Sequence, residues 1–354
     1  MSKLVLFIGA LDRGGAEKVA AVLSSFYCDY FDEVVVLTYY NSMVFYELNP
    51  KVRHACVEKE TQTQSIVKNL RWIRKFAKRE RPSVWLSLMM PFNIMSIWAL
   101  MGMGIPVAAC ERQDPRYEGT KLRRLVRDIS YHFCFRIQLQ TAMGKACFSK
   151  RIQKKITVIP NPNHITMEQR NSAYSQQKEK RIVTVGRLIP QKNQKLLIDA
   201  FAIAHKKHPD YQLCFYGDGP LEAELRQYAS NYGLEDNKDV VFCGQVKDVI
   251  NRISPANIFV LSSIMEGMPN ALMEAVALGI PSISTDVSGA RDIIADGESG
   301  YIVPVGDKDA LATRMIQLIE SEETRKRFSE ASASVIDKFD KEKILKQWLE
   351  FVTI

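Results

Sequence analysis

The sequence predicts an α/β protein made of two doubly wound domains, each with a parallel sheet, that face each other across a cleft. Three observations support this fold class. The length of 354 residues suits about two domains. The composition, with 46% apolar and 25% charged residues, is that of an ordinary globular protein. Apolar, β-rich runs alternate with amphipathic stretches along the whole chain, as expected for strands connected by helices.

The apolar runs give the expected strands in chain order. They are residues 4–10, 33–39, 84–89, 106–110, 136–141 and 156–160 in the first half, and 181–186, 211–217, 239–244, 258–263 and 280–285 in the second. Between the two sets, residues 164–180 are polar and lack apolar periodicity, so we interpret them as a linker. The expected domains are therefore residues 1–165 and 166–339. The pattern leaves open whether the last helix, residues 340–354, packs back on the first domain.

Cysteine and hydropathy patterns limit the class of protein. Seven cysteines with no C-x-x-C pair match neither a zinc site nor a disulfide framework, and they favour reduced thiols in the cytoplasm. The first apolar run is short and has no small-residue cleavage site, which argues against a signal peptide. Residues 83–110 contain no charged side chain and are long enough to suggest a membrane span. Because Pro91, Gly102 and Pro106 divide them, we expect a strand, a turn at 90–93, a helix and a second strand instead.

The first candidate site residues lie where predicted strands end, because ligands of open α/β sheets bind at the carboxyl ends of strands. Gly14 and Gly15 follow the first strand and precede a helix, whose exposed N–H groups suit an oxyanion. A tight turn is the alternative interpretation. Arg187 and Lys192 follow the strand at 181–186 and suit a diphosphate. Exposed loop cations without a ligand would give the same pattern.

Two further candidate residues also lie where predicted strands end. Gly217 ends the strand at 211–217, where turn chemistry alone accounts for most of the glycine-rich loop. In FCGQVKDV (242–249), Gly244 would let a flat base lie against the backbone. We assign Gly217 and Val246 to the same nucleotide-binding set.

The most informative junction is SSIMEGMPNALMEAVALGIPSIST. Pro269 is placed to open a helix, which would direct the N–H groups of Asn270, Ala271 and Leu272 toward a phosphate. Glu274 lies in the early helix, where its carboxylate can accept hydrogen bonds from a diol such as ribose. Glu266 lies eight residues earlier, so both carboxylates can face one ligand. Alternatively, Glu274 only complements the helix dipole and Glu266 only caps the helix.

These residues resemble the retaining glycosyltransferases of family 4, which have the GT-B fold. The most specific part of the resemblance is an E-x7-E motif, here Glu266 to Glu274. It is supported by VGRLIPQKN, by YGDGPLEAEL, by VIPNPN (158–163) and by GGAE (14–17). The resemblance covers both expected domains, and it implies two Rossmann-like domains and transfer of a sugar from a nucleoside diphosphate to an acceptor hydroxyl.

The resemblance also implies roles for the candidate residues. Arg187 and Lys192 would hold the donor diphosphate, Glu274 the ribose, and Glu266 the transferred sugar. The backbone near Asn270–Leu272 would meet the phosphates, with Gly15 also on the nucleotide side. No metal or other cofactor is implied, because cations and a helix N-terminus would stabilise the leaving group. The one D-x-D sequence, at 307–309, is typical of a helix cap after a turn. UDP is the nucleotide that the resemblance favours.

One stretch departs from the family pattern. Where the family often has a histidine in the first domain, AACERQDPR (108–116) has Glu111 and Arg112. We assign Gly14, Glu111 and Arg112 to the acceptor side. Arginine cannot act as a base at neutral pH, so the acceptor proton would pass to the departing phosphate.

Basic residues are concentrated in the first half of the chain. Residues 1–165 contain 25 basic and 13 acidic residues, whereas the remainder contains 23 and 27. The stretches 65–81 and 121–133 combine cations with apolar side chains, as do helices that bind anionic membranes. A solvated outer helix face is the alternative, and nucleic-acid binding gains no support because no reading motif accompanies the charge.

The sequence therefore predicts a metal-independent, retaining GT-B glycosyltransferase. Its expected partners are a nucleotide-sugar donor and a bacterial surface glycan, and the hypothesis for the acceptor is a glycan on a polyprenyl diphosphate carrier at the inner face of the membrane. Two rival functions are a GT-B nucleotide-sugar epimerase and a non-catalytic nucleotide-sugar-binding scaffold.

Overall fold

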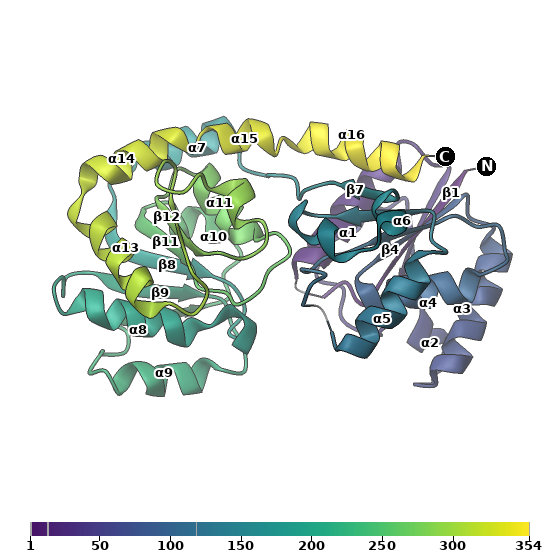
Figure 1. The fold of residues 1–354 in the computed structure, drawn as a ribbon, viewed down its shortest axis with the longest axis horizontal. Coiled ribbons are helices and arrows are strands. Elements are labelled where there is room, and N and C mark those ends of the chain that lie inside the picture. Colours follow the sequence, from purple (N-terminus) through teal and green to yellow (C-terminus); the bar gives the residue numbers. More distant parts are fainter. Residues whose placement is uncertain (1, 13, 118, 354) are drawn as a thin grey trace. The chain divides into compact units, whose positions relative to one another are not determined.

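The computed structural model describes residues 2–12, 14–117 and 119–353. The chain divides into two compact units: Met1–Asn161 together with Glu342–Ile354, and Pro162–Lys341. Each unit is built on a parallel sheet with helices packed against it (Figure 1). The predicted α/β class is therefore confirmed in both units.

The first unit contains, in its described residues, a seven-stranded parallel sheet with the order β3-β2-β1-β4-β5-β6-β7. Its strands are β1 (Lys3–Ile8), β2 (Glu33–Thr38), β3 (Val52–Cys56), β4 (Val84–Leu88), β5 (Val107–Cys110), β6 (Arg136–Leu139) and β7 (Ile156–Val158). Its helices are α1 (Gly15–Tyr27), α2 (Val57–Thr61), α3 (Ile66–Glu80), α4 (Met90–Leu100), α5 (Lys121–Tyr131), α6 (Lys150–Gln153) and α16 (Lys341–Val352), with a 3₁₀ turn at Met143–Cys147.

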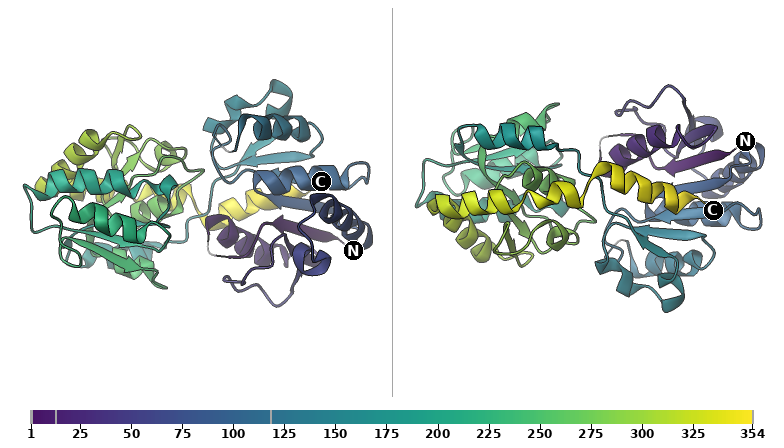
Figure 2. Two further views of the ribbon diagram at one scale, coloured as in Figure 1. Left: turned by 90° about the horizontal axis from the view of Figure 1, so that it is seen from below. Right: turned by 90° about the horizontal axis from the view of Figure 1, so that it is seen from above.

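Alternating residues of these strands face two helical layers. Phe7, Trp85 and their neighbours on one face form a single apolar core with buried side chains of α3, α4 and α5. On the opposite face, Tyr27 of α1 donates its hydroxyl hydrogen to the carbonyl of Trp348 in α16, at 3.1 Å, and both side chains are fully buried. Figure 2 shows α16 beside α1. The last helix therefore belongs to the fold of the first unit.

The second unit contains, among the residues described, a six-stranded parallel sheet with the order β10-β9-β8-β11-β12-β13. Its strands are β8 (Glu179–Val185), β9 (Gln212–Tyr216), β10 (Val240–Gly244), β11 (Ala256–Leu261), β12 (Ser282–Thr285) and β13 (Tyr301–Val303). Its helices are α7 (Met167–Ser175), α8 (Gln194–His205), α9 (Glu222–Ser230), α10 (Val249–Ile253), α11 (Asn270–Ala277), α12 (Ala290–Ile293), α13 (Lys308–Glu320), α14 (Glu322–Ala331) and α15 (Ser334–Lys338), with a 3₁₀ turn at Pro190–Lys192.

Both sheets reverse their strand order at one point. In the first unit the chain adds β2 and β3 on one side of β1 and then places β4 on the other side. In the second unit β8 has β9 on one side and β11 on the other. Connections on the two sides leave the sheet toward opposite faces, so the loops diverge there and form the usual ligand crevice at the carboxyl ends of the strands. The loops after β8 and β11 are therefore the first place to examine.

Two expectations need correction. Residues 164–180 are not a linker, because they form α7 and the start of β8. Thr166 and Gln169 make a capping box at the start of α7, and the buried Arg170 donates to the carbonyl of Ala277 at 2.9 Å. A short helix held by polar contacts leaves little apolar periodicity in the sequence. The turn expected at 90–93 is instead the first turn of α4.

Within the described part of the chain, no helix has the length and apolar character needed to cross a membrane. The uncharged stretch 83–110 instead forms the buried strands β4 and β5 and, between them, the helix α4, most of whose residues are buried. Strands that are covered on both faces by helices acquire this continuous apolar character. The strand–helix–strand interpretation is confirmed.

Candidate functional site at the carboxyl edge of the second sheet

Two loops meet at the point where the second sheet reverses its strand order. The first loop joins β8 to α8, and the second joins β11 to α11. Gln191 donates its side-chain N–H to the carbonyl of Met265 at 2.7 Å, and the backbone N–H of Ile264 donates to the carbonyl of Gln191 at 2.9 Å. The Ser262 hydroxyl donates to the carbonyl of Lys192 at 2.9 Å. These bonds fix the two loops against each other before any ligand binds.

An ion pair between Lys192 and Glu266 lies at the centre of this junction. Lys192 Nζ is 2.6 Å from Glu266 Oε1. The Ser263 hydroxyl donates to the same oxygen at 2.6 Å. Glu266 is 8% exposed, so the cation and the hydroxyl compensate for its burial. Because both contacts use Oε1, Oε2 is the oxygen that a ligand could contact.

Arg187 is exposed beside this pair. Its side chain makes no hydrogen bond or ion pair with any residue the structure describes, while its carbonyl accepts a bond from the Gln194 side chain at 2.9 Å. The backbone is thus held and the guanidinium remains available. A planar, exposed guanidinium near a lysine suits the oxygens of a diphosphate.

The helix α11 begins immediately after the Glu266 loop. Its hydrogen-bond ladder starts with Met273 N–H donating to the Pro269 carbonyl at 3.1 Å, so the N–H groups of residues 270–272 precede the ladder. Glu274 is half-buried on the second turn. No side chain caps α11, and Glu266 instead pairs with Lys192. The alternative in which Glu266 serves as the helix cap is therefore wrong.

Glycines allow the surrounding loops to approach closely. A Cβ added to Gly217 would lie 2.1 Å from the carbonyl oxygen of Gly186, and one added to Gly289 would lie 3.1 Å from Met268 Cα. Gly217 is thus explained by backbone packing against the Arg187 loop. Gly244, with φ +63°, has open space where a Cβ would stand, and Val246 is half-buried in the loop that follows. An uncovered glycine backbone leaves room for a flat ring.

Two candidate residues of the first unit, Gly14 and Gly15, form the start of α1. Gly15 is its first residue, and Gly14 caps it with extended backbone and no side-chain bond. The Glu17 carboxylate lies against Gly14, since a Cβ added there would be 2.2 Å from Glu17 Oε2. Against the larger lowering by burial, the negative charge of Glu17 also raises the pKa of Arg112. Glu17 was not predicted as a site residue, although its place three residues after the cap is a sequence signal for such a contact.

The two neighbours Glu111 and Arg112 turn in different directions. Glu111 is buried and accepts a hydrogen bond from the Tyr131 hydroxyl at 2.5 Å. Arg112 donates from Nη2 to Asn161 Oδ1 at 2.7 Å, while its Nε and Nη1 have no hydrogen-bond partner among the described residues. Burial lowers the pKa of Arg112 to about 10, so it remains charged at neutral pH. Arg112 therefore faces Asn161, and Glu111 faces Tyr131.

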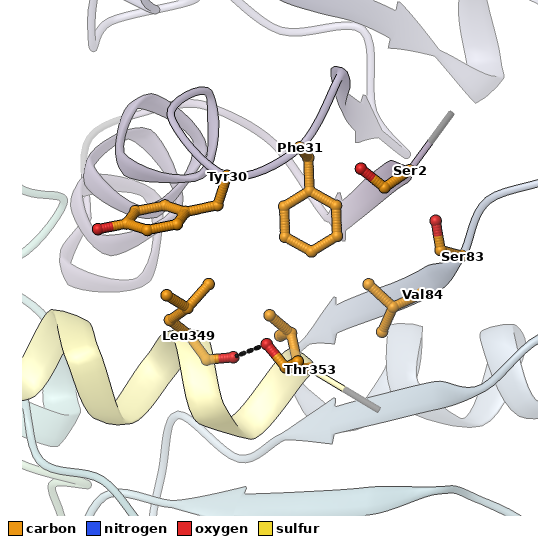
Figure 3. Close-up of a pocket in the computed structure, with 8 residues that line it drawn as sticks. Ser2, Tyr30, Phe31, Ser83, Val84, Leu349 and Thr353 are labelled. Atoms are coloured by element: carbon orange, nitrogen blue, oxygen red, sulfur yellow. Dashed lines mark hydrogen bonds between the residues drawn. The ribbon is translucent and has the colours of Figure 1, made fainter.

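Three other features bear on where a ligand could bind. No group of three or more His, Cys, Asp or Glu side chains that could hold a metal occurs in the described residues. Asp307 caps α13 by accepting from Ala310 N–H at 2.9 Å, which confirms the cap predicted for the D-x-D sequence. A cavity of about 370 Å³ lies between α16 and the amino-terminal ends of β1 and β4 (Figure 3). Its lining is apolar with a few hydroxyls, and it lies at the sheet edge opposite to the one where ligands usually bind.

Sequence comparisons match this chain to one family model and to several known proteins. Residues 166–335 match the family model described as "Glycosyl transferases group 1". An α-1,4-N-acetyl-D-galactosaminyltransferase of Campylobacter jejuni is 27% identical over 360 residues, which cover 99% of this chain and 98% of that enzyme. Its name specifies a GalNAc-containing glycan on undecaprenyl diphosphate. The amylovoran biosynthesis glycosyltransferase AmsD of Erwinia amylovora is 26% identical over 98% of this chain and 97% of its own.

Solved structures give the fold. Anabaena HepE, crystallised with UDP and glucose, superposes with a TM-score of 0.81 at 16% identity over 99% of each chain. TarM of S. aureus superposes with a TM-score of 0.83 at 12% identity over the whole of both chains. The predicted GT-B fold is confirmed. Together with the matched family model, these findings support a glycosyltransferase with the GT-B fold.

Proposed function

We propose that this chain is a retaining, metal-independent glycosyltransferase of family 4 that transfers a sugar from a UDP-sugar to a hydroxyl of a bacterial surface glycan. The observation that carries the proposal is the Lys192–Glu266 pair at the strand-order reversal of the second sheet. It combines a cation and a carboxylate at the place where this type of sheet binds nucleotides. Such a pair suits a ligand that has both phosphates and hydroxyl groups.

The donor groups are assigned by their chemistry. Arg187 and Lys192 bind the diphosphate together with the first N–H groups of α11, and Glu274 accepts hydrogen bonds from the ribose. The free oxygen of Glu266 accepts a hydrogen bond from the transferred sugar. The uncovered backbone at Gly244 receives the base, with Val246 beside it. HepE was crystallised with UDP and glucose, which favours UDP as the nucleotide here.

The reaction exchanges one bond for another on the same face of the sugar. The bond between the anomeric carbon and the phosphate oxygen breaks, and the acceptor oxygen forms the new bond to that carbon. The acceptor proton passes to the departing phosphate oxygen, since Arg112 stays protonated and cannot remove it. Arg187, Lys192 and the helix N-terminus stabilise the negative charge of the leaving UDP, so the chemistry does not require a metal ion.

The acceptor is proposed from the relatives. The C. jejuni enzyme is named for a glycan on undecaprenyl diphosphate, and AmsD for amylovoran biosynthesis. We therefore infer a growing glycan on a polyprenyl diphosphate carrier, with the enzyme in the cytoplasm at the inner face of the membrane. Gly14, Glu17 and Arg112 form the acceptor side in this proposal.

The test is the variant Glu266→Gln, assayed for UDP release from a panel of UDP-sugars with lipid-linked glycans extracted from membranes as acceptors. We expect turnover to fall by about 100-fold or more. UDP affinity, measured by thermal shift with and without EDTA, should stay within about twofold, because Glu266 contacts the sugar and not the nucleotide. Glu323→Gln, an exposed change on α14, is the matched control and should leave both values unchanged.

Each rival function gives a different result. An epimerase would convert the donor sugar without any acceptor. A scaffold would bind UDP but show no turnover in the unaltered chain. Full turnover in Glu266→Gln, or absence of UDP binding with and without EDTA, would exclude the proposed site.

A further inference from the structure

Helix α5 is amphipathic, but its apolar side faces outward. Leu122, Leu125 and Ile129 are 70%, 57% and 48% exposed, and Phe133 just beyond the helix is 61% exposed. With Val126, they are spaced at three- and four-residue intervals and form one stripe. A stripe of this kind normally packs on the core. Here it needs a partner outside the unit.

Polar contacts hold α5 in this orientation. The buried Arg127 donates to the carbonyl of Pro115 at 2.7 Å, and its guanidinium lies 4.5 Å from the centre of the Phe148 ring. Ser130 is also buried and accepts a hydrogen bond from the Trp98 indole N–H at 2.9 Å. Rotating the helix to bury its apolar stripe would break these bonds and leave the Pro115 carbonyl and the Trp98 N–H without their hydrogen-bond partners. The outward stripe is therefore a fixed feature of the fold.

Helix α4 extends the apolar surface. Trp98 is 44% exposed, and its ring centre lies 6.4 Å from that of Phe133. Tryptophan with a bonded N–H and an exposed ring is typical of the boundary between water and lipid. We call Leu122, Leu125, Val126, Ile129, Phe133 and Trp98 the α5 apolar surface.

Exposed cations occur on α5 itself and on α3, which is separated from α5 by α4. Helix α3 packs against α4, which packs against α5 (Figure 1). Ile73 and Phe76 of α3 are buried in the core, and its outward side carries cations together with the exposed Ile66 and Val67 of its first turn. The exposed cations of α3 that form no ion pair with described residues are Lys68, Arg71, Arg74, Lys75 and Lys78. Lys121 and Arg123 are exposed on α5 itself.

We propose that the α5 apolar surface enters the headgroup boundary of an anionic bilayer while the cations of α3 and α5 contact lipid phosphates. Charge decides between a bilayer and a second copy of this chain. Residues 1–165 carry 25 basic and 13 acidic residues, so pairing two copies through this face would bring like charges together. An anionic bilayer supplies the opposite charge. This inference rests on the proposed function in one respect: the lipid-linked acceptor proposed there would lie in the same bilayer.

The test is co-sedimentation of the full chain with vesicles of phosphatidylcholine alone or mixed with phosphatidylglycerol, at low and high salt. The chain should bind the mixed vesicles and be largely released by salt. Leu125→Ser with Ile129→Ser should weaken partition by about 10-fold or more and make the residual binding fully salt-sensitive. Lys68→Gln with Arg71→Gln and Lys75→Gln should weaken binding to mixed vesicles only. The matched control is Tyr232→Ser with Val305→Ser, two exposed apolar residues of the second unit.

The outcomes separate this inference from the proposed function. Unchanged partition of the Leu125/Ile129 variant would overturn the inference, as would absence of vesicle binding by the unaltered chain. So would a dimer, seen by sedimentation equilibrium, that the Leu125/Ile129 variant dissolves. UDP-induced thermal shift and turnover with detergent-solubilised acceptor should be normal in this variant, because the donor site is untouched. Glu266→Gln should in turn bind vesicles normally.

Discussion

Glu266 is 8% exposed, and burying a carboxylate to this degree is costly unless a cation or hydrogen bonds compensate for the lost water. Lys192 and Ser263 both supply such contacts at 2.6 Å. Lys192 therefore has a structural role as the partner of Glu266 and, in the proposed reaction, a second role at the diphosphate. The two roles can be separated by a double-mutant cycle.

We predict that Lys192→Met lowers the free energy of unfolding by roughly 1–2 kcal/mol, because it leaves Glu266 without its cation. Adding Glu266→Gln should recover part of this loss, since the neutral amide no longer needs a cation. Turnover should stay low in both single variants and in the double variant. Urea unfolding and UDP release are the measurements. Stability losses that simply add in the double variant would show that the two side chains are not coupled.

The meeting of two loops at this point could be predicted because strand ends and an E-x7-E spacing are visible in the sequence, whereas the donor-binding roles of their residues stay predictions. The loops that carry Lys192 and Glu266 do meet at the reversal point. The directions of consecutive side chains were not predictable. The sequence therefore did not show that Glu111 and Arg112 have different partners. Ser263 and Glu17 were missed because a serine after a strand and a glutamate after two glycines have many structural uses.

At the scale of elements, every apolar run predicted as a strand forms one, whereas β3 and β13 were not predicted. Both lie at the edges of their sheets, and β13 is buried but only three residues long, which is too short for a clear pattern. The β3 sequence VRHAC is partly exposed and holds an arginine and a histidine, so it lacks the apolar signal of the central strands. Edge strands of this kind depend on side-chain contacts for their attachment.

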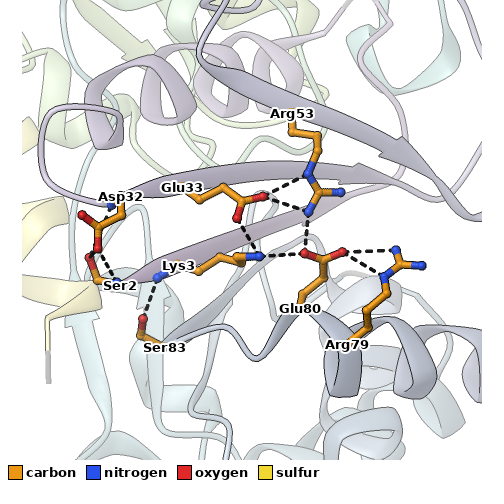
Figure 4. A network of polar contacts seen from close by, with 8 residues as sticks. All are labelled: Ser2, Lys3, Asp32, Glu33, Arg53, Arg79, Glu80 and Ser83. Atoms are coloured by element: carbon orange, nitrogen blue, oxygen red, sulfur yellow. Dashed lines mark hydrogen bonds and ion pairs between the residues drawn. The ribbon is translucent and has the colours of Figure 1, made fainter.

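A cluster of charges attaches β3 to its neighbours (Figure 4). Arg53 of β3 contacts Glu33 of β2 at 3.0 Å and Glu80 of α3 at 2.5 Å, and Lys3 of β1 contacts the same two carboxylates at 2.6 and 2.8 Å. The hydrogen bond from Lys3 is the main cause of the lowered pKa of Glu33. Burial raises the pKa of Glu80, but the contacts with Lys3, Arg53 and Arg79 outweigh it and lower the pKa overall.

This network predicts a loss of stability in acid. A carboxyl group with a lower pKa in the folded than in the unfolded state stabilises the fold above its unfolded pKa, about 4.5 for glutamate, and loses this effect as the pH falls through the folded pKa. The urea concentration that half-unfolds the first unit should therefore decrease as the pH is lowered below about 4.5. Glu33→Gln with Glu80→Gln should lower the midpoint at pH 7 and flatten its decline in acid. The exposed Glu60→Gln should change neither, and an unchanged acid decline in the double variant would contradict the assignment.

At the scale of the whole molecule, the chain completes its first unit with its last residues. Five side chains of α16 are buried there: Ile344, Leu345, Trp348, Phe351 and Val352. Arg136 of β6 donates to the carbonyls of Glu350, Phe351 and Thr353 at 2.6–3.0 Å. The first unit thus depends on a segment separated from it in sequence by the whole of the second unit.

We therefore predict that Trp348→Ala destabilises the first unit alone. Removing a fully buried tryptophan leaves a cavity and costs about 3–5 kcal/mol. All four tryptophans, Trp72, Trp85, Trp98 and Trp348, belong to the first unit, so the fluorescence of the remaining three reports the unfolding of that unit. The thermal midpoint of the first unit, followed by fluorescence, should shift to lower temperature. The midpoint of the second unit should stay in place, and it is identified as the one that UDP raises, because the proposed donor site belongs to that unit. Lys346→Ala, on the exposed side of α16, is the control and should shift neither midpoint. If Trp348→Ala lowered both midpoints together, the two units would unfold as one, and α16 would stabilise the whole chain rather than the first unit alone.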